Sequence, residues 1–380
     1  MKQTARIIST YSADVFGVCS ALFELGGMTV MHDASGCNST YTTHDEPRWY
    51  DMDSMVYISG LTEMEAIMGD DEKLIGDIVD AAKELKPNFV AVAGTPIPAM
   101  TGFDFDSIAW MIEQQTDIPA LGFKTTGMNT YVYGASMALE AYARRFVTRE
   151  IEKTKELSVN ILGVTPLDFS VNGADAAIEM FLRDAGFSVI SKWAMGSTPQ
   201  ELSKAGSAHV NLVVSAVGLG VAKALYELFG TPYVIGAPYG DKFSAKVIDA
   251  LRLAVETGDN QEIMVDLPGE DIVLIGEGIT SRSLAQAIEL ETGRGAKVLC
   301  TTECDQAHLR LKDKLTRDEE EIEEAIAGAR IMIADPLFRP ICPEDVRFVP
   351  LPAEAFSGRI YRSEIPNLIS ELERFVKEEL

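Results

Sequence analysis

Cysteines are the residues of this chain best suited to metal or redox chemistry. The chain carries five of them in 380 residues, namely Cys19, Cys37, Cys300, Cys304 and Cys342. An odd and sparse set in a chain of this length, with no export signal at its start, does not suggest a disulfide framework. Free thiols and metal ligands are therefore the two interpretations to compare.

Cys37 occupies the most informative stretch, CSALFELGGMTVMHDASGCNSTY. The pattern predicts a helix over about residues 12–25, stopped by Gly26 and Gly27, then the strand MTVMH and a glycine turn. A thiolate on such a loop, with backbone N–H groups nearby, suits an iron–sulfur cluster. The alternative is that Cys37 is a small buried core residue.

The other cysteine group lies near the end of the chain. In LCTTECDQAH, Cys300 and Cys304 are four residues apart at the end of a predicted strand, and Cys342 follows another strand in a proline-rich loop. Both loops could face one crevice, as a metal site or a redox pair. The spacing is not diagnostic, so unliganded thiols are the alternative.

Polar residues after the Cys37 loop are candidates for substrate contact. The stretch TYTTHDEPRWYD contains His44, Arg48 and Trp49, which could line a substrate cavity or a dimer contact, or form a surface turn. Lys124, in KTTG, follows a predicted strand and is a third candidate for catalysis beside His44 and Arg48. No catalytic residue is assigned beyond these candidates.

Alternating strands and helices must position these residues. Apolar strand-like runs lead into helical patterns at residues 88–93, 159–164 and 271–276, and a helix–proline–strand–glycine motif occurs at residues 116–127 and 229–240. This pattern is typical of parallel sheets with helices on both faces. We expect three doubly wound units over residues 1–155, 156–265 and 266–380, with ligands beyond the carboxyl ends of the strands.

Composition excludes several classes of function. A hydrophobic fraction of 47% and a charged fraction of 24% indicate a folded protein, and no apolar stretch approaches the roughly 20 residues of a membrane helix. The net charge of −25 would repel nucleic acid. The start lacks the apolar core of a signal peptide, so we expect a cytoplasmic protein. The sequence has no GxxxxGK[ST] motif, so we do not expect it to hydrolyse ATP.

The sequence resembles the nitrogenase component 1 family, which includes nitrogenase subunits and nitrogenase-like tetrapyrrole reductases. HDASGC at residues 32–37 is similar to the family's HGPxGC-like cluster loop, and residues 56–109 continue the likeness. The resemblance implies three Rossmann-like units and a 4Fe–4S cluster with Cys37 as a ligand. It also places His32 and Gly36 in the cluster loop, where His32 would fix the turn by hydrogen bonds.

Departures from the family pattern affect the ligand set. Thr95-Pro96 stands where relatives have cysteine-proline, and the first family cysteine falls near Ala13 or Asp14 rather than at Cys19. Cys19 is therefore a second candidate ligand, and Asp14 could replace it. A symmetric homodimer sharing one cluster would supply Cys19 and Cys37 twice. Cys300, Cys304 and Cys342 do not match the family's cofactor ligands, so no molybdenum cofactor is expected.

The resemblance implies an anaerobic oxidoreductase that takes electrons from a separate ATP-dependent iron protein. Through a cluster at a dimer interface it would reduce a tetrapyrrole-like or small-molecule substrate. Its partner subunit would be a second copy or a paralogous chain. Two alternatives remain: a scaffold that holds a metal cluster or cofactor during assembly, and a small-molecule binding protein without redox chemistry.

Overall fold

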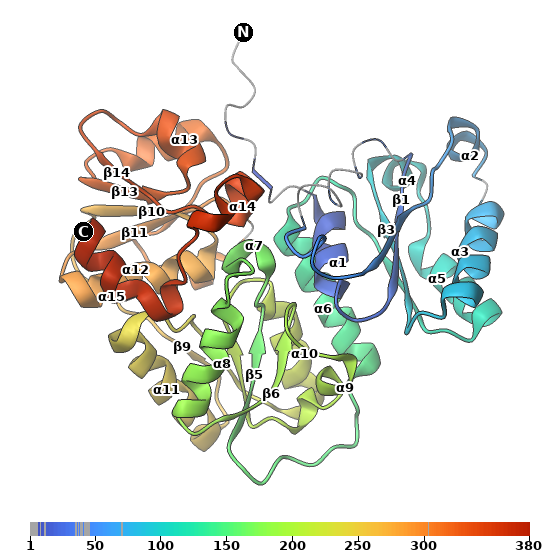
Figure 1. Cartoon of the computed structure of the whole chain (residues 1–380), viewed down its shortest axis with the longest axis horizontal. Helices are drawn as coiled ribbons and strands as arrows, with labels where there is room; N and C mark the ends of the chain where they lie inside the picture. Colours follow the sequence, from blue (N-terminus) through green and yellow to red (C-terminus); the bar gives the residue numbers. More distant parts are fainter. Residues whose placement is uncertain are drawn as a thin grey trace.

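The computed structural model describes residues 7, 9–10, 13–34, 36, 38, 41, 46–69, 71–302 and 304–380. It contains three separate parallel β-sheets, each flanked by helices (Figure 1). The prediction of an α/β fold with three parallel sheets is confirmed. Cys37 and His44 lie outside the described residues.

The first sheet has the strand order β2-β1-β3-β4, with all pairs parallel. β3 reads VAVAG and is buried along its whole length, as expected for a central strand covered on both faces. Its strands are β1 (Met28–His32), β2 (Met55–Ile58), β3 (Val90–Gly94) and β4 (Ala120–Phe123). Its helices are α1 (Asp14–Leu22), α2 (Glu63–Met68), α3 (Asp71–Leu85), α4 (Pro96–Thr101), α5 (Phe105–Thr116) and α6 (Tyr131–Phe146).

The second sheet has the order β6-β5-β7-β8-β9 and is also parallel. Its strands are β5 (Ser158–Leu162), β6 (Ser188–Trp193), β7 (Val210–Val213), β8 (Tyr233–Ile235) and β9 (Gln261–Glu262). Its helices are α7 (Pro166–Phe169), α8 (Ala174–Asp184), α9 (Pro199–Leu202), the short 3₁₀ turn η2 (Ala205–Ser207), α10 (Gly218–Phe229) and α11 (Gly240–Thr257).

The third sheet has the order β12-β11-β10-β13-β14, again parallel. Its strands are β10 (Ile272–Gly276), β11 (Ala296–Cys300), β12 (Lys314–Leu315), β13 (Ile331–Ala334) and β14 (Arg347–Pro350). Its helices are α12 (Gly278–Thr292), η3 (Gln306–His308), α13 (Glu319–Ile326), η4 (Pro336–Ile341), α14 (Glu354–Ser357), η5 (Gly358–Glu364) and α15 (Leu368–Glu379).

The boundaries between the three units remain predictions. The C-terminal helix α15, which we assigned to the third unit, packs against two units. This C-terminal helix contacts α8 and α11 of the second unit as well as α12 of the third. Leu368 and Leu372 are buried there. α15 therefore joins the second and third units and does not belong to the third alone. No helix of the described residues is both long enough and apolar enough to cross a membrane.

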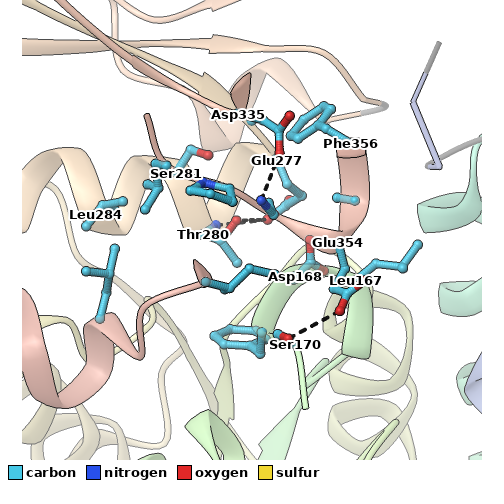
Figure 2. Close-up of a pocket in the computed structure, with 18 of the residues that line it drawn as sticks. Leu167, Asp168, Ser170, Glu277, Thr280, Ser281, Leu284, Asp335, Glu354 and Phe356 are labelled. Carbon is cyan, nitrogen blue, oxygen red and sulfur yellow. Dashed lines mark hydrogen bonds between the residues drawn. The ribbon is translucent and has the colours of Figure 1, made fainter. Parts of the chain in front are cut away.

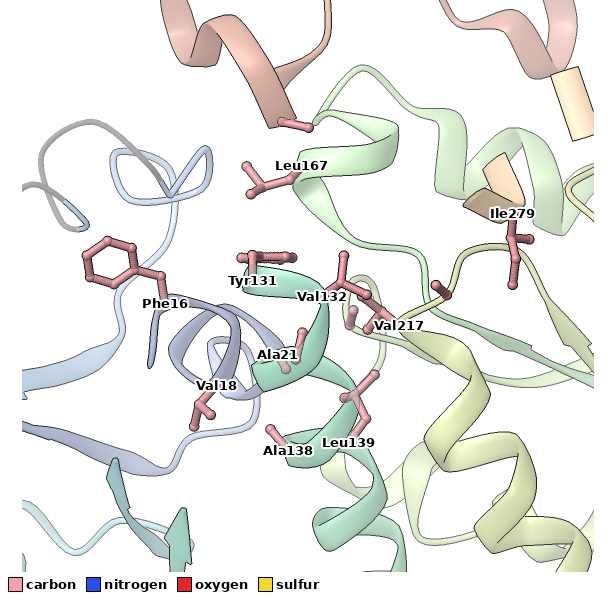
Figure 3. Packing of buried hydrophobic residues seen from close by; sticks show 14 of the residues in the cluster. Phe16, Val18, Ala21, Tyr131, Val132, Ala138, Leu139, Leu167, Val217 and Ile279 are labelled. Atoms are coloured by element: carbon pink, nitrogen blue, oxygen red, sulfur yellow. The ribbon is translucent and has the colours of Figure 1, made fainter. Parts of the chain in front are cut away.

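A single apolar cluster joins all three units at the centre of the molecule (Figure 3). It brings together side chains of α1 and α6, of the second unit and of α12, including Phe16, Val18, Ala21, Tyr131, Val132, Ala138, Leu139, Leu167, Val217 and Ile279. Figure 1 shows α1, α6 and α7 lying near this shared centre. The three units are therefore packed as one body.

Two glycines allow α1 and α6 to pack backbone against backbone. A Cβ atom on Gly17 would lie 2.1 Å from the Tyr131 carbonyl oxygen, and one on Gly134 would lie 1.8 Å from the Asp14 carbonyl oxygen. Neither distance is compatible with any side chain at these positions. The close approach of α1 to α6 therefore requires glycine on both helices.

We predict that Gly134→Ala lowers the free energy of unfolding by about 3 kcal/mol or more, because the added methyl must displace backbone atoms. The matched control is Gly76→Ala in α3, where an added Cβ has no neighbour within 4 Å. That change should raise stability by about 0.5–1 kcal/mol, because alanine is the better helix former. Urea unfolding followed by circular dichroism measures both. Equal effects of the two substitutions would contradict the close-packing account.

Candidate functional site

The loop predicted to hold a cluster follows the carboxyl end of β1. Beyond β1, the described residue Gly36 is exposed, and Asn38 is buried and donates a hydrogen bond to Asp33 Oδ2 at 2.8 Å. Cys37 lies between them in sequence. The residue that follows the cysteine is therefore anchored to the end of β1.

His32, the last residue of β1, is held in the turn. Its Nδ1 lies 2.9 Å from Ser59 Oγ, and its ring packs on Phe103 with centroids 4.5 Å apart. Burial lowers the pKa of His32 to about 4, although Asp33 opposes this shift, so the imidazole is neutral at pH 7. This geometry suits the turn-fixing position expected for His32.

Thr95, at the position where the family resemblance led us to expect a cysteine, takes a structural role. Its Oγ1 lies 3.0 Å from the His32 carbonyl oxygen and 2.9 Å from Asp33 Oδ1, and the residue is buried. The hydroxyl hydrogen can be donated to either acceptor. Thr95 thus connects the ends of β1 and β3 and offers no thiolate.

The Asp14 carboxylate is already saturated with hydrogen bonds. It accepts from the backbone N–H groups of Val15 (2.9 Å), Thr126 (3.0 Å) and Gly127 (2.7 Å) and from Asn129 Nδ2 (2.9 Å). Both oxygens take part, and the residue is fully buried. Asp14 therefore anchors the start of α1 to the loop after β4, and a metal ion would have to displace these donors.

Cys19 lies in the interior of α1. It is 0% exposed and belongs to the central apolar cluster. Burial raises the pKa of the Cys19 thiol, with the nearby charge of Glu46 adding to the effect. Within the described residues, no group of three or more histidine, cysteine, aspartate and glutamate side chains is arranged to hold a metal ion.

Arg48 lies in a buried ion-pair network. Its guanidinium contacts Glu46 Oε1 (2.7 Å), Glu24 Oε1 (2.8 Å) and the carbonyl oxygens of Ser20 (2.8 Å) and Ala194 (2.9 Å). Burial alone would lower the pKa of Arg48, but Glu46 and Glu24 raise it. Arg48 is thus neither in a surface turn nor open to a substrate. It ties the first unit to the second.

Lys124 follows β4 of the first sheet, whereas Cys300, Cys304 and Cys342 belong to the third unit. Lys124 is exposed and pairs with Asp106 at 3.0 Å, which raises the pKa of the lysine. Cys342 Sγ lies 3.5 Å from the Val346 carbonyl oxygen. Cys300 and Cys304 both approach Gly278 at the start of α12.

Large apolar side chains are exposed on α2, α4 and the loop after β4, three segments that follow the carboxyl ends of β2, β3 and β4. We call this set the apolar patch; its members are Met64, Ile67, Met68, Ile97, Met100 and Met128. α2 and α4 contact each other, and Met100 is 86% exposed. A run of large apolar side chains in water is typical of a surface that another protein covers.

A cavity that sequence reasoning missed lies between the second and third units. Its empty space is about 790 Å³, part of it open to solvent. It lies beyond the carboxyl ends of both sheets, where α/β proteins bind ligands. Four acidic side chains converge on it from the two units (Figure 2): Asp168, Glu277, Asp335 and Glu354.

Asp168 is an acid of this cavity whose neutral form is favoured by burial. Thr165 Oγ1 lies 2.6 Å from Asp168 Oδ2. Burial raises the pKa of Asp168 well above its ordinary value, and the charge of Glu277 raises it further. Burial and the same two acids raise the pKa of Tyr239, which also lines the cavity. Asp168 is therefore suited to donate a proton.

Glu277 and Asp335 are fixed by backbone donors. Glu277 caps α12, accepting from the N–H groups of Ile279 (3.0 Å) and Thr280 (2.8 Å). Asp335 accepts from Ala353 N (2.9 Å) and Ser357 Oγ (2.7 Å), yet burial still raises its pKa. Each acid follows a buried strand directly, in LIGEG and MIADP. An acidic residue directly after a buried apolar strand is the sequence feature that could have predicted this site.

Glu354 is the remaining acid and is paired with Arg362. The guanidinium Nε and Nη2 both contact its carboxylate, the latter at 3.1 Å from Oε2. Glu354 is buried, and Ser170 Oγ lies 3.5 Å from its Oε1. The cavity is therefore lined by a carboxylate paired with arginine and by Asp168, whose neutral form burial favours.

Comparison with curated proteins finds relatives of several kinds. The chain is 25% identical over 219 residues to the nitrogenase iron-molybdenum cofactor biosynthesis protein NifE of Rippkaea orientalis, covering 56% of this chain and 45% of that protein. It is 26% identical over 200 residues to one subunit of the light-independent protochlorophyllide reductase of Nostoc punctiforme, covering 49% and 39%. It is 26% identical over 196 residues to the nitrogenase molybdenum-iron protein alpha chain of Methanococcus maripaludis, covering 50% and 40%.

The aligned part spans less than half the length of each of these three relatives. Among solved structures, "Nitrogenase Cp1 at pH 6.5" superposes with a TM-score of 0.71 at 17% identity, covering all of this chain and 93% of that one. That likeness shows the fold. The family model described as nitrogenase component 1 type oxidoreductase matches residues 15–331. The chain therefore belongs to the nitrogenase component 1 type oxidoreductase family.

Proposed function

We propose that this chain is the substrate-reducing subunit of a nitrogenase-like oxidoreductase that receives electrons from a separate ATP-dependent iron protein. The observation that carries the proposal is the acid-lined cavity between the second and third units. Reduction of an unsaturated substrate consumes protons as well as electrons. Burial favours the neutral form of the Asp168 carboxyl group, which lines the cavity, and we propose Asp168 as the proton donor to the substrate. A tetrapyrrole-like or other small unsaturated molecule is the proposed substrate class.

The iron–sulfur cluster of this proposal needs ligands from a partner. Of the five cysteines, Cys19 is buried in the core, and Cys300, Cys304 and Cys342 belong to the third unit. Cys37, which follows β1 in the sequence and lies outside the described residues, is then the candidate ligand that remains for the first unit. Two copies would supply two thiolates, which does not fit a cubane held by four protein thiolates.

The apolar patch supports a partner subunit. α2 and α4 follow the strands on either side of β1, the strand that precedes Cys37 in the sequence, and both helices carry exposed methionines and isoleucines. A subunit docked on this patch could donate ligands to the cluster. The thiolate count favours a paralogous partner with more cysteines over a second copy of this chain.

A scaffold for cluster or cofactor assembly is the second candidate. It is favoured by the small number of candidate cysteine ligands, because a scaffold must release what it holds, and by the alignment to a cofactor biosynthesis protein. A scaffold would transfer its iron to an acceptor. The acid-lined cavity, with its proton donor, is the feature that a scaffold does not need.

We predict that Cys37→Ala abolishes iron binding, whereas Cys19→Ala retains it, because Cys19 is enclosed by the apolar core. Iron and acid-labile sulfide are measured per chain on protein purified without oxygen, together with any partner that copurifies. Cys342→Ala is the matched control. Iron that survives Cys37→Ala, or protein that never contains iron, would remove the cluster from the proposal.

We predict a pH-dependent stability difference for Asp168→Asn. The folded-state pKa of Asp168 is raised, so its contribution to stability is present below its ordinary pKa and is lost as pH rises through the raised value. Asparagine is uncharged at every pH, so the variant does not lose this stability as pH rises. The thermal midpoint of Asp168→Asn, relative to that of wild type, should therefore increase as pH rises from 5 to about 8. Parallel curves for the two proteins would show that Asp168 is not held neutral.

A further inference from the structure

Two thiols of the third unit lie side by side at the start of α12. Cys300 ends β11 and is completely buried, whereas Cys304 lies on the following loop and is partly exposed. A Cβ built on Gly278 would lie 2.5 Å from Cys304 Sγ and 3.5 Å from Cys300 Sγ. Both sulfurs therefore lie near the position that a side chain at residue 278 would occupy. They fit there because Gly278 has no side chain.

The two thiols differ in acidity. A hydrogen bond from Cys304 lowers the pKa of Cys300, and the same hydrogen bond raises the pKa of Cys304. Cys300 is therefore the sulfur better stabilised as a thiolate. Cys342, the remaining cysteine of this unit, points its Sγ at the carbonyl oxygens of Pro343 and Val346.

Cys304 can be reached from a groove to which all three units contribute. Cys304 and Asp305 line it together with Tyr133 and Met137 of α6 and Leu219 of α10. Cys300 does not line this groove. A reagent entering the groove would therefore meet Cys304 first.

We propose that Cys300 and Cys304 form a thiol–disulfide exchange site whose reaction partner is a small-molecule disulfide. Cys304 passes its proton to the Cys300 sulfur and attacks one sulfur of the incoming disulfide, whose S–S bond breaks and releases a first thiolate. Cys300 gives this proton to the released thiolate and attacks Cys304 Sγ, which forms the internal disulfide and expels a second thiolate that takes a proton from solvent. The two cysteines lose two electrons, and the incoming disulfide becomes two thiols. This site is independent of the proposed reductase function.

Oxidised glutathione added to the fully reduced protein without oxygen tests the site, with intact mass and peptide mapping as the readouts. Wild type should lose two hydrogen atoms and carry a Cys300–Cys304 disulfide without bound glutathione. Cys300→Ser should accumulate glutathione on Cys304, because no second thiol can expel it. Cys304→Ser should leave Cys300 unreacted, because it is buried.

Gly278→Ala and Cys342→Ser separate the geometry from general thiol reactivity. Gly278→Ala displaces the Cys304 sulfur, so the mixed disulfide should persist and the internal one should form several-fold more slowly. Cys342→Ser should behave as wild type. Wild type that keeps glutathione on Cys304 as Cys300→Ser does, or that forms no Cys300–Cys304 disulfide, would overturn the proposal.

Discussion

The backbone contact between α1 and α6 is the constraint on which the centre of the molecule depends. Gly17 and Gly134 allow the two helices to touch without side chains between them, and the Asp14 carboxylate fixes the start of α1 to the loop after β4. α6 in turn packs on α10 of the second unit. The position of α1 thereby determines how the first unit meets the second.

This packing gives structural roles to several residues that the sequence suggested as candidate site residues. Because α1 is enclosed, Cys19 lies in the apolar core and Asp14 anchors the start of the helix. Arg48 bridges the first and second units. The first sheet has an apolar patch on α2, α4 and the loop after β4. The gap between the second and third units keeps a set of acids that face a cavity. Both features lie beyond the carboxyl ends of parallel strands, where loops are free of the sheet's hydrogen bonding.

The sequence predicted the sheets well because buried parallel strands appear as continuous apolar runs. The runs at residues 88–93, 159–164 and 271–276 correspond to β3, β5 and β10. It predicted less of the sites, because Asp168, Glu277, Asp335 and Glu354 are brought together only by the packing of two units. Arg48 shows the same limit, since its contact with Ala194 spans 146 residues. The sequence predicted a helix from about residue 12, whereas α1 begins at Asp14. The Asp14 carboxylate accepts the hydrogen bonds that anchor this end of the helix.

The central claim is that this subunit consumes electrons and does not merely carry metal. The most direct measurement mixes the anaerobic, iron-loaded protein and its partner with a reduced ATP-dependent iron protein, then follows ATP-dependent oxidation of that donor together with iron retained on this chain. We expect sustained oxidation of the donor once an unsaturated tetrapyrrole is added, with iron retained. Transfer of the iron to an acceptor protein, without electron consumption, would contradict the claim and assign the chain to cofactor assembly.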